Sequence, residues 1–62
     1  GLRHYALAEK FATEGAWPSA IEQLKIARAA AGTDFYLGSV IDARLRAFQN
    51  QYREEQNEKR KS

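Results

Sequence analysis

The chain has 62 residues, of which ten are Lys or Arg and eight are Asp or Glu, and it contains no cysteine. A chain this short forms one small domain at most, and without cysteine neither a disulfide nor a thiolate zinc site can stabilise it. The near balance of charge argues against a nucleic-acid-binding protein, which needs a basic stripe on a folded face, and no apolar run is long enough to span a membrane.

The first predicted helix covers residues 2–14. Leu7, Ala8 and Phe11 keep the three-and-four spacing of one helix face, and alanine and leucine favour helix. Gly15 suits the left-handed position at which many helices end. We therefore expect this helix to stop in a tight turn.

The second predicted helix covers residues 18–31. Pro18 suits the first helical position, where its missing N–H costs nothing. Ala20, Leu24 and Ala27 form one stripe, whose small members would let the first helix approach closely. Trp17 falls in the break between the two helices, and we expect its ring to pack against both of them.

Gly32 and Asp34 predict a second break, with Gly32 ending one helix and Thr33 or Asp34 capping the next near Phe35. The third predicted helix covers residues 35–52 or beyond. Its apolar seam steps by four, four, three and four through Leu37, Ile41, Leu45, Phe48 and Tyr52. Residues 53–62 are polar, and we expect an unanchored tail that extends the helix or frays.

The predicted fold is therefore all-α. Short connections make neighbouring helices antiparallel, so residues 1–52 should form a three-helix antiparallel array, a helical hairpin capped by a long C-terminal helix. The residues expected to hold this structure together are Leu7, Ala8, Phe11, Gly15, Trp17, Ala20, Leu24, Ala27, Ile41 and Leu45.

The charged and titratable residues offer no catalytic or metal-binding constellation. His4 is the only histidine, so zinc lacks a second nitrogen ligand here, and a packing or helix-start role is expected. Glu9 is expected on a solvated helix face. Asp42 and Arg46 have the spacing of a favourable pair within one helix, as do Glu55 and Lys59.

The first 34 residues resemble one tetratricopeptide (TPR) repeat, a helical hairpin of that length. The resemblance rests on Leu7, Ala8, Phe11, Gly15, Trp17, Ala20, Ile21, Leu24 and Ala27. Two departures concern helix packing: Arg28 stands where an apolar residue is usual, and Asp42 occupies the place of a small residue at a helix crossing. Two more departures are His4, which stands where a bulky residue is usual, and Gly32, which stands where a proline is common. The departure at Asp42 favours a capping helix over a second full repeat.

A more specific resemblance covers residues 7–9, 15, 20–24, 32–36 and 39–46. This pattern is similar to the C-terminal end of the bacterial periplasmic HExxH zinc metallopeptidases of the β-barrel assembly-enhancing protease type. The resemblance implies a TPR tail of an enzyme in outer-membrane protein quality control, with zinc held in the parent protein and a periplasmic location, although a cytoplasmic one stays open. The HExxH motif is absent from this sequence, so no catalytic or metal-binding residue is carried over, and no enzyme activity or cofactor is expected of the chain itself.

The TPR resemblance implies a surface for protein or peptide segments. Its lining would be Leu2, Tyr5, Glu9 and Thr13 of the first helix and Tyr36, Ser39 and Arg46 of the third. The partners would include the parent's own peptidase domain and outer-membrane assembly proteins, but no nucleic acid. Arg44 and Arg46, about 200° apart on a helix, do not make one basic patch.

Two other roles stay open. The segment could serve only to cap the helical array. Alternatively, it could be a stand-alone self-association module, a homodimer when isolated, because Phe48 and Tyr52 at the far end of the seam extend past the second helix.

Overall fold

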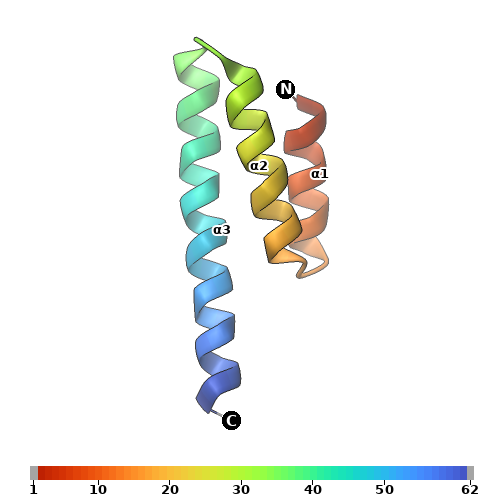
Figure 1. Ribbon diagram of the computed structural model, residues 1–62, viewed down its shortest axis with the longest axis vertical. Helices are drawn as coiled ribbons and strands as arrows, with labels where there is room; N and C mark the ends of the chain where they lie inside the picture. The colour runs from red at the N-terminus through yellow and green to blue at the C-terminus, as the bar shows by residue number, and fades with distance from the viewer. Residues whose placement is uncertain (1, 62) are drawn as a thin grey trace.

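The computed structural model describes residues 2–61, with side chains for residues 3–59. Its elements are α1 (Leu2–Thr13), α2 (Trp17–Ala31) and α3 (Phe35–Lys61), and the described residues include no strand. Successive helices are antiparallel, and α2 lies between α1 and α3 and packs against both (Figure 1). The predicted all-α, three-helix antiparallel array is confirmed.

The turn between α1 and α2 has the hydrogen bonds of a Schellman motif. The N–H of Ala16 donates to the carbonyl oxygen of Phe11 at 2.9 Å, and the N–H of Gly15 donates to that of Ala12 at 3.0 Å. Gly15 has a φ of 78°, which a side chain would strain. The predicted glycine stop is therefore present, and α1 ends at Thr13, one residue before its predicted end.

The start of α2 corrects the prediction by one residue. Ala16 is the N-cap and makes no side-chain cap, Trp17 is the first helical residue, and Pro18 follows it. A proline in the first turn costs no hydrogen bond, because its N–H would have no partner within the helix. Trp17 thus belongs to a helix and not to the break.

Asp34 caps α3 as predicted. Its Oδ1 accepts a hydrogen bond from the N–H of Leu37 at 3.0 Å, and its carbonyl oxygen accepts one from Gly38 at 2.9 Å. Gly32, with a φ of 59°, ends α2. Local capping chemistry therefore places the start of α3 at Phe35, where the sequence predicts it.

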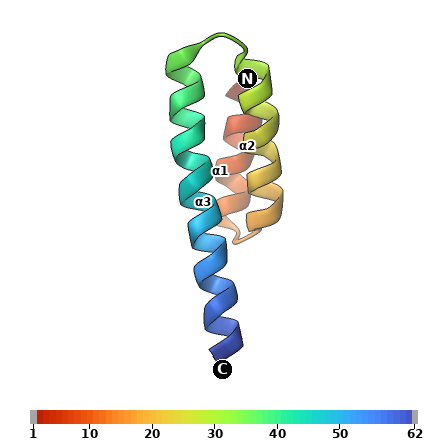
Figure 2. The ribbon, with the colours of Figure 1, turned by 60° about the vertical axis from the view of Figure 1, so that its left-hand side comes forward.

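Helix α3 is much longer than its neighbours. It has 27 residues and is about 40 Å long, so its last turns extend beyond the α1–α2 hairpin (Figures 1 and 2). Residues 53–61 thus continue the helix. The prediction of an unanchored tail is wrong at Glu55, whose Oε2 accepts a hydrogen bond from Nε1 of Trp17.

A single apolar cluster lies between the three helices. Its buried members are Ala8, Ala20, Leu24, Ala27, Ile41 and Phe48. Around them pack partly buried side chains: Tyr5, Phe11, Ala12, Trp17, Ile21, Ala31, Leu37 and Leu45. The small residues come from α1 and α2 and the larger ones mostly from α3, so the alanines allow α1 and α2 to pack closely. Leu7 is only half-buried.

Arg28 and Asp42, the two residues that depart from the packing expected by resemblance to a TPR repeat, pair with each other. Nε of Arg28 lies 3.1 Å from Oδ1 of Asp42, across the α2–α3 contact. The guanidinium lies over Gly38, where a Cβ atom would be 3.0 Å from Cζ of Arg28. The predicted pair of Asp42 with Arg46 does not form within the described residues, because the carboxylate turns to α2 instead.

Candidate protein-interaction surface

Glu9 and Arg44 join the two outer helices directly. Nε of Arg44 donates to Oε1 of Glu9 at 2.9 Å, and Nη2 donates to Oε2 at 2.9 Å. This two-bond geometry is the strongest form of an arginine–carboxylate pair, and both side chains are about two-fifths exposed. Glu9 is therefore held within the molecule, which corrects the expectation of a freely solvated carboxylate.

The other predicted lining residues of α1 lie beside Glu9. Tyr5 is half-buried against the core cluster, and Thr13 is exposed, with its Oγ1 donating to the carbonyl oxygen of Glu9 at 2.9 Å. The side chain of Leu2 lies outside the described residues. The described α1 residues thus share the face that turns toward α3.

The predicted lining residues of α3 do not all share one face. Tyr36, Ser39 and Arg46 are all exposed. Arg44 marks the side of α3 that faces α1, and Arg46 lies about 200° around the helix from it. Arg46 and Ser39 therefore lie on the outer side of α3, and only Tyr36 lies near the side facing α1.

A row of apolar side chains does lie next to Arg44 on α3. We define the α3 row as Tyr36, Val40, Ala43 and Ala47. All four lie within about 100° of Arg44, on the side away from the buried Ile41. Val40 is half-buried and the other three are exposed. Of these four, only Tyr36 was a predicted lining residue. Val40, Ala43 and Ala47 do not stand out in the sequence, because the larger residues of the seam that begins at Leu37 already account for the buried face of the helix.

Trp17 contacts α3, which corrects its expected place between α1 and α2. Its ring meets that of Phe48 edge to face, with the centroids 5.4 Å apart. The guanidinium of Arg44 lies 4.9 Å from the centroid of the same Phe48 ring. With the hydrogen bond from Trp17 to Glu55, these contacts link α3 to α1 through Arg44 and to the first turn of α2 through Trp17. They fix the position of α3 against the hairpin.

Phe48 is not available for self-association. It is 3% exposed, because Trp17 and Arg44 cover its ring. Tyr52 is half-buried. The sequence contained one usable signal for this arrangement: Arg44 and Phe48 are four residues apart and so lie on one side of a helix.

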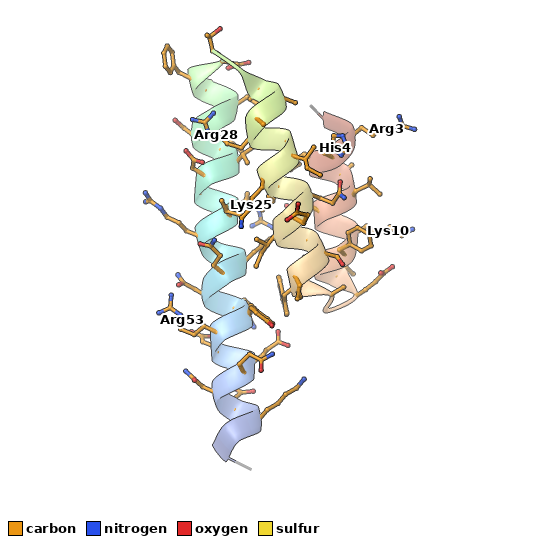
Figure 3. The ribbon with its side chains drawn as sticks, viewed as in Figure 1. Arg3, His4, Lys10, Lys25, Arg28 and Arg53 are labelled. Atoms are coloured by element: carbon orange, nitrogen blue, oxygen red, sulfur yellow. The ribbon has the colours of Figure 1, made fainter. Side chains whose placement is uncertain are left out.

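His4 has the structural setting that the sequence suggests. Its Nδ1 lies 2.8 Å from Oε1 of Gln23, which joins α1 to α2 (Figure 3). Within the described residues there is no cluster of three potential metal ligands among His, Cys, Asp and Glu, and there is no pocket. None of the helices described combines the length and apolar character that crossing a bilayer requires.

Comparison with known proteins adds no relative. No protein-family model matches the chain, and neither a curated protein nor a solved structure is significantly similar to it.

Proposed function

We propose that this chain is a TPR-type protein-interaction module that receives a segment of another protein on the side shared by α1 and α3. The observation that carries the proposal is the α3 row, an apolar strip beside the ion pair of Glu9 with Arg44. Tyr36 at its upper end is 82% exposed, and Ala43 and Ala47 are exposed below it. A large exposed aromatic side chain on a helix that the core holds rigidly is typical of an interface anchor.

The rigidity of α3 supports the proposal. A surface that is already ordered loses little conformational entropy when a partner binds. Three contacts of α3 with the hairpin supply that order: Arg44 with Glu9, Phe48 with Trp17, and Glu55 with Trp17. The α3 row lies directly beside the first of them.

Photo-crosslinking tests this function. Replacing Tyr36 with p-benzoylphenylalanine should produce a discrete crosslinked product in cells that express the native partner. The matched control is the same replacement at Ile26, a 38% exposed residue on the outer side of α2. Equal products from both positions, or none from Tyr36, would reject the proposed surface.

We also propose that the chain is the non-catalytic C-terminal part of a periplasmic zinc metallopeptidase in outer-membrane protein quality control. The support is the resemblance at residues 32–36 and 39–46. In that setting zinc belongs to a preceding domain, and the module recognises substrate, the peptidase domain or assembly proteins. The upstream sequence of the parent gene decides: an HExxH motif supports this identity, and its absence reduces the proposal to a generic TPR module.

Self-association is the second candidate function. The observation that favours it is the pair of exposed aromatic residues at the start of α3, where Phe35 is 87% and Tyr36 82% exposed. Two such rings on one copy could pack against those of another. A monomer at high concentration in analytical ultracentrifugation would reject this candidate.

A further inference from the structure

The α3 row has the spacing of a helix–helix contact. Its residues follow one another by four, three and four, the interval at which one helix packs along another. Ala43 and Ala47, its last two members, are small, so the axis of a docked helix could come close to α3 there. Tyr36 at one end supplies a large ring, and the polar Glu54 continues the row at the other end. The shape of the row thus suits a helix better than an extended strand.

One edge of the α3 row is basic. Arg46 and Arg53 are seven residues apart, so they lie on the same side of α3. Arg46 directly precedes Ala47 of the row, and Arg53 directly precedes Glu54, which continues it. Both are exposed, and Arg53 projects away from α1 and α2 (Figure 3). In a pair of helices this is the position whose charges meet the partner's edge. Ser39, at the equivalent place one heptad earlier, is neutral.

These two arginines are not neutralised by carboxylates. Arg46 takes part in no ion pair within the described residues, and the hydrogen bond given for Arg53 goes to the neutral Asn50, at 3.3 Å. Asp42, the carboxylate nearest to Arg46 in the sequence, is bound by Arg28 on α2. The acids in line with the row, Glu54 and Glu58, lie beyond its apolar part. An arriving helix therefore meets an apolar row with a positive edge.

We propose that the α3 row docks an acidic amphipathic helix, with small or apolar side chains on the row and carboxylates opposite Arg46 and Arg53. This rests on the proposed function and names the class of partner. Arginine is the cation best suited to such a contact, because its planar guanidinium binds a carboxylate through two hydrogen bonds.

A second copy of this chain fits the surface less well. In an antiparallel pair of copies matched row to row, residue 36 of one copy lies opposite residue 47 of the other. Arg46 then lies opposite the uncharged Phe35 and Ser39 of the same edge, and Arg53 lies beyond the start of the other copy's α3. A second copy thus offers these two arginines no carboxylate on that edge, whereas a partner of different sequence can.

Two synthetic peptides test the proposal. Both are amphipathic helices of about 18 residues, or five turns, with identical apolar rows. One carries glutamates at the flanking positions and the other carries lysines. Fluorescence anisotropy of the labelled peptides measures binding at low and at high salt. The glutamate peptide should bind at least about fivefold more tightly than the lysine peptide, as expected of two exposed ion pairs. Added salt should reduce this difference in affinity.

Variants locate the effect. The double change Arg46→Glu and Arg53→Glu should reverse the preference between the peptides, whereas Lys25→Glu, at an exposed cation of α2, should leave it unchanged. Ala47→Gln should weaken the binding of both peptides. Its control Ala29→Gln, at an exposed alanine of α2, should leave the binding of both unchanged. All of these positions are at the surface, so circular dichroism should show unchanged folding.

The outcomes separate this inference from the proposed function. Equal binding of both peptides, lost in Ala47→Gln, would overturn the acidic partner while leaving a helix-binding surface in place. Binding of neither peptide would overturn the inference, although crosslinks from Tyr36 could still support an interaction module that takes another kind of segment. Dimerisation of the natural chain that Ala47→Gln abolishes would overturn it in favour of a second copy.

Discussion

Replacing Gly38 with alanine tests whether Arg28 lies over α3. Glycine in a helix interior is less favourable than alanine by about 1 kcal/mol, so the change should stabilise α3 unless something occupies the space of the new methyl group. A Cβ atom at position 38 would lie 3.0 Å from both Cζ and Nη1 of Arg28. The guanidinium must therefore move.

The size of the effect follows from what Arg28 loses when it moves. Its Nε is 3.1 Å from Oδ1 of Asp42, and the two side chains are 43% and 47% exposed. An ion pair so accessible to water contributes about 0–1 kcal/mol. Gly38→Ala alone should therefore change the free energy of unfolding by between zero and about +1 kcal/mol, because the gain in helix propensity and the disturbed ion pair oppose each other.

The Arg28→Ala background removes that opposition. There Gly38→Ala should give the full gain of about 1 kcal/mol. Thermal unfolding followed by circular dichroism suits the comparison, since 1 kcal/mol shifts the Tm of a domain of this size by about 4–8 °C. Four proteins complete the cycle: the natural chain, each single variant and the double variant.

Two results would refute this reasoning. Equal stabilisation in both backgrounds would show that Arg28 does not occupy the space above Gly38. A loss of stability that persists in the double variant would show that the backbone of α2, and not a flexible side chain, approaches α3 there.

Three further changes test the hairpin and the attachment of α3. Ala20→Leu should overpack the α1–α2 crossing and cost about 1–3 kcal/mol by urea denaturation, whereas Ala29→Leu at an exposed site of α2 should cost little. Gly15→Ala should cost about 1–2 kcal/mol through backbone strain alone, because no atom lies within 4 Å of the added Cβ; an unchanged Tm would contradict the left-handed turn. Trp17→Phe should cost about 1 kcal/mol by losing the N–H donor to Glu55, and adding Glu55→Ala to it should cost little more; additive losses would disprove that hydrogen bond.

The features that the sequence predicts well are those decided by neighbouring residues. Gly15 and Gly32 adopt left-handed φ values, and Asp34 caps α3 through a residue three positions on. The alanine stripe at the crossing also follows from the spacing along one helix. Each needs only the local geometry of the chain, which is why element boundaries are correct to within one residue apart from the C-terminal extension of α3.

The candidate surface depends on how each helix is rotated about its axis. Neighbouring residues in the sequence do not determine that rotation. Arg44 and not Arg46 faces α1 because the ring of Phe48 must be buried next to α2. The partners of Arg44 and of Trp17 are 35 and 38 residues away in the sequence. Only the packed core brings such residues together, and no spacing rule predicts them.

The ion pair of Arg28 with Asp42 has a consequence for how this sequence can change. Positions 28, 38 and 42 form one unit across two helices. A chain with an apolar residue at position 28 would have no guanidinium for an aspartate at 42 and would have room for alanine at 38. Substitutions at these three sites should accordingly occur together in homologous sequences, and a lone change at any one of them should be rare.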